Sequence, residues 1–590
     1  MFKLMRYFKW YEWILALVIV GMTVLQVFAD LHLIDKMGDI VALIESTLKG
    51  GRVTKAMLWD EGIEMLITVA ISVTLVVLET IFAAKIASTL AARLRKNVFS
   101  KVAQFSMEEI NKFSTPSLIT RTTNDITQIQ QVMTMMLRMM LYAPTMAICS
   151  VVKIIGESVV LSWTTVAAIC CIVLLLVMMF LFVVPKFKLI QKQTDKLNGV
   201  ARENLTGLRV VRANSAEQIQ EAKFDKVNGD LTKTGLFINR VASIMHPGMS
   251  LVMSGLALAI VWIGAFIINK DPNFIDTMLT FTQYAMHVVM SFLVVSMLFI
   301  MFPRGQVSAN RVLEVLNTKP KILDGEVDEN VLSLNSKTLG YEMPKGEVEF
   351  RNVSFKYPDA EGYVLENISF KAKKGQTVAF IGSTGSGKST LINLIPRFYD
   401  ATEGEVLIDG VNVKNYKIET LNNKLGYVPQ RGVLFSGSVE SNVKYGKDDA
   451  TEEEVRRALK IAQANFVNKL EGGTNYHISQ GGKNVSGGQK QRLSISRAVI
   501  KNPEIYIFDD SFSALDYKTD KALRAALKKE TKDATKLIVA QRIGTIMDAD
   551  QIIVLDKGKA VGQGTHKQLL KNCKIYKELA YSQLSKEELE

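Results

Sequence analysis

Long runs of apolar residues dominate the first half of the chain and stop near residue 302. Six stretches reach the ~17–25 apolar residues that a helix needs to cross a bilayer. After about residue 335 the pattern changes to short β-branched runs, glycine turns and amphipathic segments, which are typical of a soluble α/β domain. The six stretches are Trp13–Ala29, Met65–Ala84, Met133–Ile155, Val159–Val184, Met249–Ile268 and Met278–Phe302.

Length and composition agree with this division. The chain has 590 residues, more than the ~250–300 at which a single hydrophobic core stops growing. Of its 25 methionines, 23 lie at or before Met301. Thioether side chains suit a surface that accepts varied apolar ligands, but they also face lipid in many proteins, so both interpretations stay open. Four cysteines are too few for a disulfide framework or a zinc cluster.

Basic residues orient the membrane domain and account for much of the net charge of +13. If the N-terminus is inside, the inner segments hold 21 lysines and arginines and the outer segments hold 5. Because positive residues gather on the cytoplasmic side, we expect a multi-pass protein of the plasma membrane with both termini cytoplasmic. The basic excess then predicts no nucleic-acid partner. The inner segments are 1–12, 85–132 and 186–244, and the outer segments are 30–64, 156–158 and 269–277.

The inner loops are long, and parts of them have helical periodicity, over Thr122–Met136 and Lys186–Gly207. We therefore expect helices that continue past the bilayer toward the cytoplasmic half of the chain. Charged residues also lie inside the apolar stretches, where they usually face a bundle interior or a water-filled pathway. Lys153 lies near a helix end, which favours a side chain that extends to the membrane surface. For Glu79, and for Arg138, a cavity-facing role stays open.

A glycine-rich motif, G-x-x-x-x-G-K-S, follows the predicted buried strand Thr377–Ile381. Glycines in this context let backbone N–H groups turn toward phosphates, and the following helix begins with its positive dipole end. Lys388 is placed to reach the β- and γ-phosphates of ATP, and the Ser389 hydroxyl to bind Mg²⁺. The residues predicted to hold the nucleotide are Gly382, Ser383, Thr384, Gly385, Ser386, Gly387, Lys388, Ser389 and Thr390.

A second predicted buried strand, Ile505–Phe508, ends in two aspartates. A carboxylate at the end of a strand beside a phosphate loop is the protein's contribution to the magnesium site, so Asp509 is predicted to bind the metal. Asp510 follows at the place from which a carboxylate orients or deprotonates the attacking water. ATP and Mg²⁺ are therefore the predicted cofactors.

Between these motifs, Val485–Gln489 closely resembles the signature of the ATP-binding-cassette family, commonly written LSGGQ. The resemblance covers the whole second half. It implies that Tyr357 stacks on adenine, that Gln430 is the Q-loop glutamine, with a catalytic and a metal role, and that Asp516 belongs to the D-loop. The signature residues, which it implies contact an ATP held by a partner chain, are Ser486, Gly487, Gly488 and Gln489.

The first half resembles the membrane domain of the exporter type of this family. Phe113–Leu118, with Arg121 and Asp125, resembles the first intracellular loop, and Glu203–Val211 resembles the second. In that family such loops carry short coupling helices that press on the cassettes. One chain has half the parts, which implies a dimer with twelve membrane helices. The expected fold is a six-helix transmembrane exporter domain (1–318), a linker (319–338) and an α/β P-loop ATP-binding cassette (339–590).

Two positions depart from the family pattern. The family has Asp-Glu where this chain has Asp509-Asp510, so the second carboxylate is one methylene shorter. The family's switch histidine is replaced by Gln541, which hydrogen-bonds a phosphate but carries neither a proton nor a positive charge. Because the signature is intact, these features predict the degenerate half of a heterodimeric exporter, completed by a second, non-identical half-transporter. A slow homodimer with two weak sites is the alternative.

The predicted function is ATP-driven export of hydrophobic or amphipathic compounds across a bacterial membrane by alternating access. A dedicated lipid or peptide exporter is an alternative within transport. An ATP-gated or regulatory membrane protein with little turnover is an alternative from another class. An importer is disfavoured because importers usually keep permease and cassette on separate chains, and six spans exclude a soluble cassette protein that acts on nucleic acid. The transported compound is not determined by the sequence.

Overall fold

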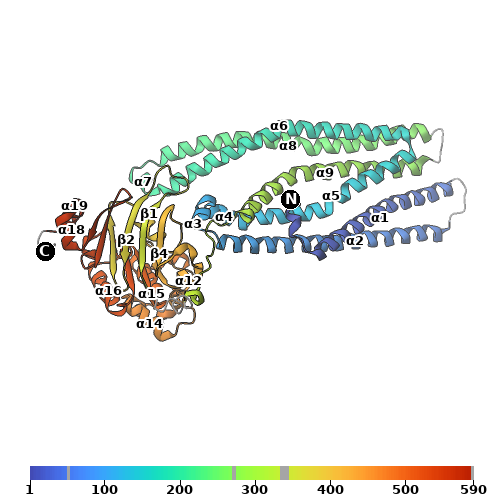
Figure 1. Cartoon of the computed structure of the whole chain (residues 1–590). Coiled ribbons are helices and arrows are strands. Elements are labelled where there is room, and N and C mark those ends of the chain that lie inside the picture. The colour runs from blue at the N-terminus through green and yellow to red at the C-terminus, as the bar shows by residue number, and fades with distance from the viewer. Residues whose placement is uncertain (49–53, 269–273, 333–344, 586–590) are drawn as a thin grey trace. The chain divides into compact units, whose positions relative to one another are not determined.

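A computed structural model of the chain describes residues 1–48, 54–268, 274–332 and 345–585. These residues divide into two compact units (Figure 1). The membrane unit comprises Met1–Lys101 and Pro116–Thr318, and the cassette unit comprises Val102–Thr115 and Lys319–Glu590. A short segment that precedes the third apolar stretch is therefore part of the cassette unit.

Long helices make up the membrane unit. Six of them, among the described residues, are long and apolar enough to cross a membrane, which confirms the six predicted spans. Their lengths, from 34 to 52 residues, exceed the ~20 that a bilayer requires, because each apolar stretch continues into polar helical turns. Within the unit, α5 packs mainly on α9 and α6 on α8. The six are α1 (Trp10–Leu48), α2 (Lys55–Ala103), α5 (Asn124–Glu157), α6 (Val159–Thr206), α8 (Glu217–Ile268) and α9 (Phe274–Asn317).

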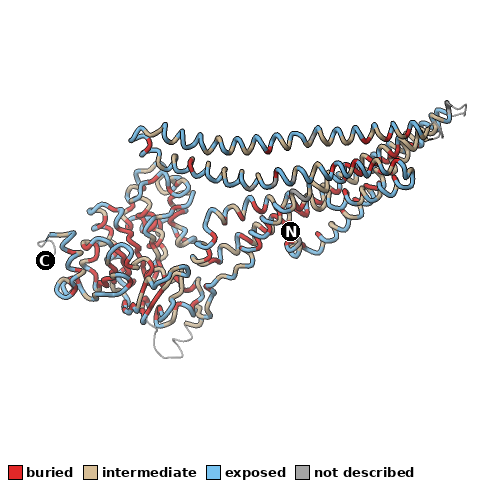
Figure 2. The backbone as a smooth tube through the Cα atoms, turned by 90° about the horizontal axis from the view of Figure 1, so that it is seen from above, coloured by how far each residue is buried: buried red, intermediate tan, exposed pale blue. Residues whose placement is uncertain are grey.

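Many large apolar side chains of these helices are exposed, and much of the tube along the helices carries the pale blue of exposed residues (Figure 2). Trp163, for example, is 71% exposed. A soluble protein rarely leaves such extended apolar surface uncovered, whereas a bilayer covers it.

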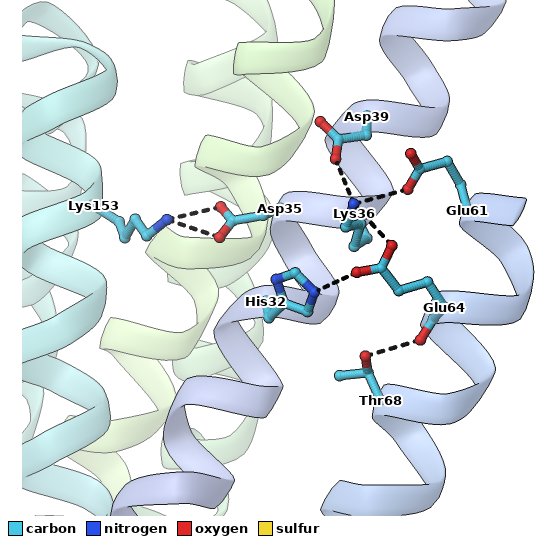
Figure 3. Close-up of polar contacts among 8 residues, drawn as sticks. All are labelled: His32, Asp35, Lys36, Asp39, Glu61, Glu64, Thr68 and Lys153. Atoms are coloured by element: carbon cyan, nitrogen blue, oxygen red, sulfur yellow. Dashed lines mark hydrogen bonds and ion pairs between the residues drawn. The ribbon is translucent and has the colours of Figure 1, made fainter. Parts of the chain in front are cut away.

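Polar side chains gather toward the C-terminal end of α1 and the N-terminal end of α2 (Figure 3). The ammonium of Lys36 lies 3.1 Å from carboxylates of both Glu61 and Glu64. The ammonium of Lys153 forms an ion pair of 2.8 Å with Asp35 of α1, a residue of the predicted outer segment 30–64. That the Lys153 side chain extends to the membrane surface stays a prediction.

Short helices occur in both predicted intracellular loops. The first loop holds α3 (Met107–Phe113) and α4 (Thr115–Thr122), and the second holds α7 (Leu208–Ala213). The two charged residues singled out in the first loop tie it to α9. Arg121 donates to the Glu314 carboxylate at 2.7 Å, and Asp125 accepts a hydrogen bond of 3.0 Å from Ser308. A further short 3-10 helix, η1, spans Phe2–Tyr7.

Two main sheets form the core of the cassette unit. The larger has the order β12-β11-β3-β10-β9-β6, and its strands from β11 to β6 are parallel. The smaller, β2-β1-β4-β5, is antiparallel. Their strands are β1 (Val348–Phe355), β2 (Leu365–Ala372), β3 (Thr377–Gly382), β4 (Glu403–Ile408), β5 (Val411–Asn412), β6 (Leu425–Val428), β9 (Ile505–Asp509), β10 (Thr535–Val539), β11 (Gln551–Asp556) and β12 (Lys559–Gly564).

Buried β-branched and aromatic side chains explain why the central strands form, since β3, β9 and β10 are almost wholly buried. A small two-stranded antiparallel sheet pairs β7 (Gly437–Ser438) with β8 (His477–Ile478). The helices around the sheets are α11 (Lys388–Asn393), α12 (Ile418–Asn423), α13 (Val439–Lys444), α14 (Glu452–Ile461), α15 (Gly487–Ile500), α16 (Tyr517–Glu530), α17 (Ile543–Ile546), α18 (His566–Asn572) and α19 (Lys574–Gln583), with 3-10 turns at Val413–Asn415, Asn465–Lys469, Gly473–Asn475 and Gln480–Gly482.

The predicted linker, 319–338, is attached to the cassette unit where it is described. Val327 donates its N–H to the Asn415 carbonyl at 2.8 Å and accepts a hydrogen bond from the Lys417 N–H at 2.9 Å. Residues 333–338 of this segment lie outside the described residues. The first part of the linker therefore adds an edge contact to the cassette.

Candidate functional site

Four neighbouring parallel strands bring the predicted nucleotide residues to one edge of the larger sheet. In the order β3, β10, β9 and β6, each strand ends at such a residue or two residues before one. Carboxyl ends of parallel strands form the usual ligand-binding edge of an α/β sheet. A cavity of about 330 Å³ lies there, lined in part by the glycine-rich loop. The residues that follow the four strands are, in the same order, the loop that begins at Gly382, Gln541, the pair Asp509 and Asp510, and Gln430.

The glycine-rich loop needs glycine for its backbone shape and for its close packing. Gly385 and Gly387 have positive φ values of 83° and 95°, which side chains disfavour. A Cβ on Gly387 would lie 2.7 Å from a methyl group of Leu365, and one on Gly382 would lie 2.0 Å from the Leu555 carbonyl oxygen. The loop therefore presents backbone rather than side chains to the cavity. Ser389 and Thr390 line the same cavity.

The ammonium group of Lys388 is folded back on this loop. It donates to the carbonyl oxygens of Gly382 at 2.9 Å and Ser383 at 2.7 Å, and to the Ser386 hydroxyl at 3.3 Å. Burial lowers the pKa of this lysine below its usual range, while the nearby Asp510 and Asp509 charges oppose that shift. Phosphate oxygens of a bound nucleotide would offer the ammonium an anionic partner in place of neutral carbonyls.

Ser389 and Asp509 form the oxygen pair expected at a magnesium site. The Ser389 hydroxyl donates to Asp509 Oδ1 at 2.8 Å, and Asp509 is 6% exposed. Burial raises the pKa of this carboxyl group above its usual value. Mg²⁺ prefers oxygen ligands and is commonly held by one or two carboxylates together with substrate phosphates, so a hydroxyl and a carboxylate at this place fit the ion. When bound, Mg²⁺ would neutralise phosphate charge.

Asp510 is held by two amides. Gln541 Nε2 donates to Asp510 Oδ2 at 2.7 Å, and Gln430 Nε2 donates to the same oxygen at 3.2 Å. The residue is 7% exposed and has a left-handed backbone, with φ of 45°, pinned by its N–H bond to the Val539 carbonyl. Burial raises the pKa of Asp510, and the hydrogen bond from Gln430 opposes this shift. One carboxylate oxygen is thus occupied by two donors, and the Gln430 amide oxygen remains available as a ligand.

Tyr357 lies beside the loop within an aromatic cluster. Its hydroxyl is 3.0 Å from the Thr390 hydroxyl, and its ring makes edge contacts with Phe355 and Tyr399 at centroid distances of 4.8 and 5.2 Å. These neighbours fix the ring close to the phosphate loop, at the place where the sequence predicts an adenine contact.

The signature residues do not line the loop's cavity. Ser486 caps the N-terminus of α15, accepting a hydrogen bond of 3.3 Å from the Gln489 N–H, while the Gln489 side chain accepts one of 2.9 Å from the Ser486 N–H. This capping box is a local reason for the sequence pattern. It leaves Ser486 and Gly487 exposed at a helix start with Gly488 half-buried behind them. The phosphate loop and the signature of one chain therefore form two separate surfaces.

Asp516 has a similar local role. Its carboxylate accepts a hydrogen bond of 2.9 Å from the Thr519 N–H at the start of α16, and this contact lowers the pKa of Asp516. The D-loop residue thus stabilises a helix start in this chain.

Tyr399 and Asn111 were missed by sequence reasoning. Asn111, in α3, donates its side-chain amide to the Tyr399 hydroxyl at 3.1 Å, and the Tyr399 ring in turn contacts Tyr357. Lys321 also donates its N–H to Glu109 of α3 at 3.2 Å. No local pattern signals a pairing between residues 288 positions apart. The first intracellular loop is thereby connected to the predicted adenine contact.

Family relationships agree with this geometry. Residues 365–513 match the family described as ABC transporter, and residues 63–292 match the family described as ABC transporter transmembrane region. The chain is 38% identical over 493 residues to an ABC transporter ATP-binding protein of Mycobacterium tuberculosis, covering 83% of each. The chain belongs to the ABC transporter family. As an ABC exporter with one membrane region and one cassette, it has the architecture of a half-transporter and binds ATP through its cassette.

Two further similarities extend this placement. The chain is 33% identical over 401 residues to the ATP-dependent lipid A-core flippase of Haemophilus influenzae, covering 68% of this chain and 66% of that protein. A solved structure of a bacterial Atm1-family ABC exporter with ATP bound has a TM-score of 0.77, at 22% identity and 98% coverage of both chains. The second similarity confirms the predicted fold, a six-helix membrane domain followed by a P-loop cassette.

Proposed function

We propose that this chain is the degenerate half of a heterodimeric ABC exporter. The observation that carries the proposal is the pair of hydrogen bonds from Gln541 and Gln430 to one oxygen of Asp510. A general base must accept a proton at an oxygen that faces the attacking water. Here two amide donors occupy Oδ2, one of the two carboxylate oxygens of Asp510, and the hydrogen bond from Gln430 opposes the rise in pKa that burial causes. This arrangement supports a site that holds MgATP better than it activates water.

The intact signature supports the heterodimer over a slow homodimer. Ser486 and Gly487 are exposed at the start of α15, free to complete an ATP site on another chain. A partner with the family's Asp-Glu pair and its switch histidine would then provide the productive site. The proposal includes the site residues named above, Mg²⁺ held by Ser389, Asp509 and Gln430, and the domain limits 1–318, 319–338 and 339–590.

The transported compounds are proposed to be hydrophobic or amphipathic. A cavity of about 300 Å³ between α5 and α9 supports this choice, because its lining is wholly apolar and rich in methionine. Flexible thioethers adapt to differently shaped apolar groups. The methionines that line it are Met135, Met136, Met140 and Met301. Both termini are proposed to be cytoplasmic, in a bacterial plasma membrane, because of the basic inner segments.

A dedicated lipid exporter is the second candidate, favoured by the similarity to lipid A-core flippases. The test is to co-purify the chain with its partner, reconstitute the complex in liposomes, and measure ATPase activity and efflux with apolar dyes and with labelled lipids. Dye-stimulated ATPase with efflux supports an exporter of varied hydrophobic or amphipathic compounds, that is, a multidrug type, and stimulation by lipid alone supports the lipid exporter. A continuous ion current on ATP addition, without efflux, would contradict both. Robust ATP hydrolysis by the chain alone would contradict the degenerate assignment.

A further inference from the structure

Glu79 of α2 has a carboxylate oxygen that no donor satisfies. The residue lies within the apolar stretch Met65–Ala84 and is 3% exposed. Its Oε1 atom is buried and has no hydrogen-bond partner in the part of the chain that the structure describes. A charged oxygen removed from water without a replacement partner is strongly unfavourable, and most of all inside a membrane. Such an atom points to a group that binds there.

Asp30 of α1 lies close enough for its charge to act on Glu79. It is well satisfied, but only by neutral donors from three helices. Ser72 donates to Oδ1 at 2.6 Å, Tyr142 donates to Oδ2 at 3.0 Å, and Gln26 lies 3.4 Å from the same oxygen. Neutral donors stabilise a carboxylate in place without cancelling its negative charge. The cluster therefore combines two acidic groups from α1 and α2.

Positive charge does not balance this cluster at short range. The positive charge of Arg138, in α5, interacts electrostatically with Glu79, and the negative charge of Asp30 interacts electrostatically with His287 of α9. Among the described residues, however, no ion pair within 4.0 Å joins Asp30 or Glu79 to a basic side chain. One guanidinium and one imidazole are set against two carboxylates. The guanidinium balances the charge of one carboxylate, which leaves the charge of the other for a further cation.

A second group of charged residues, called here the outer cluster, is formed by Asp35, Lys36, Glu64 and Lys153. It shows that carboxylates without a basic partner are not a general feature of these helices. There, Asp35 is paired with Lys153 at 2.8 Å, and Glu64 is paired with Lys36 at 3.1 Å (Figure 3). Both pairs are formed by residues of α1, α2 and α5, the helices that also carry Asp30, Glu79 and Arg138. Ion pairs therefore form where this chain supplies a partner, and the deeper carboxylate of Glu79 is left without one.

We propose that Glu79 and Asp30 bind the positive charge of the transported compound, so that the substrates are cationic amphipathic compounds. A small inorganic cation would need several oxygen ligands, most of which the cluster has already committed. An organic cation needs only the charge and an apolar environment, and its diffuse charge is cheaper to remove from water. This inference deepens the proposed export function and rests on it.

The test uses two probes of nearly equal size and opposite charge, tetraphenylphosphonium and tetraphenylborate. Binding is measured by equilibrium dialysis on the full-length chain in lipid nanodiscs without nucleotide, because all the helices that carry the cluster belong to one chain. The wild type should bind the phosphonium more tightly. Glu79→Gln, which keeps the shape and removes the charge, should raise the Kd for the phosphonium by about 10- to 100-fold, the range of one charged contact. Its Kd for tetraphenylborate should be unchanged or lower.

Matched variants separate charge from folding. Glu79→Asp keeps the charge and should retain the preference for the cation. Glu64→Gln removes a carboxylate from the outer cluster and should leave the phosphonium Kd within about twofold. Both should bind ATP like the wild type, which shows that the cassette unit is folded.

Two results would overturn the inference: a wild type without charge preference, or Glu79→Gln binding the phosphonium as tightly as the wild type, as expected if that carboxyl group carries a proton. The exporter proposal has its own readout in the ATPase activity of the complex with its partner. Stimulation there by neutral apolar dyes, together with no effect of Glu79→Gln, would refute the cation site and leave the exporter standing. Failure of every apolar compound to stimulate would refute the exporter proposal itself.

Discussion

Restoring the missing methylene at position 510 is expected to restore little ATP hydrolysis on its own. Asp510 Oδ2 already lies 2.7 Å from the Gln541 amide, which is close to the minimum for a hydrogen bond. A glutamate carboxylate would reach more than ~1 Å further and must turn away from that amide. The space between Asp510, Ser513, Gln541 and Arg542 is only about 10 Å³ and holds at most one water molecule. The cavity of about 330 Å³ at the phosphate loop is also lined by Asp510 and Gln541, so a longer side chain can turn into it, but only by giving up the present contact with the Gln541 amide.

The expected magnitude follows from where the longer carboxylate would be held. Misplacing a catalytic group by about 1 Å costs ~10²-fold in rate, so Asp510→Glu alone should gain less than ~10-fold. Gln541→His replaces the amide by a side chain that can hold a proton, and groups that act as one unit are strongly non-additive. The double variant should gain ~10²–10³-fold, equivalent to about 2.7–4 kcal/mol of activation free energy.

The assay is phosphate release by the full-length chain purified alone in nanodiscs with saturating MgATP, where a second copy supplies the facing signature. Lys388→Ala, added to the double variant, is the control and should abolish the gained activity. Equal recovery by Asp510→Glu and by the double variant would refute the reasoning, since it would show that carboxylate reach was the only defect. A wild-type rate as high as that of the double variant would refute it as well.

Further predictions concern the same cassette. In the complex with its partner, Ser486→Arg should lower ATPase activity and efflux by ~10²–10³-fold, because it removes donors from the productive site, whereas Asp510→Ala should lower them far less; equal losses would contradict the degenerate assignment. Lys388→Ala should raise the Kd for ATP in a fluorescent-nucleotide assay by about 10- to 100-fold, through loss of a charged contact of roughly 1.5–3 kcal/mol. Because burial raises the pKa of Asp509, its carboxylate gains a proton at a higher pH than an ordinary aspartate does. Mg²⁺-dependent ATP binding should therefore weaken as the pH falls through that raised pKa. The variant Asp509→Asn should bind MgATP weakly at every pH. Tyr399→Phe removes the hydroxyl that accepts a hydrogen bond from α3. It should leave ATP binding unchanged and lower the ratio of efflux to ATPase activity by about 2- to 10-fold. An unchanged ratio would show that this contact does not take part in coupling ATP hydrolysis to transport.

Features set by neighbouring residues could be predicted from the sequence. The six apolar helices, the positive-φ glycines of the phosphate loop and the capping box at Ser486 each depend on composition or spacing within a few residues. The strand that precedes the loop and the one that ends at Asp509 are equally local, since both consist of buried apolar residues. These parts follow from hydrophobic length, backbone sterics and hydrogen bonding at a helix start, all of which act at short range along the chain.

Contacts between distant segments were decided only by the tertiary structure. Strand order places β10 between β3 and β9, and this order alone brings the amides of Gln541 and Gln430 to one oxygen of Asp510. The unpartnered oxygen of Glu79 depends in the same way on the packing of helices around it. Sequence could identify these residue types as unusual, but hydrogen bonding and charge balance depend on which segments meet. That is determined by how the apolar faces of the sheet and helices pack together, and not by the order of residues along the chain.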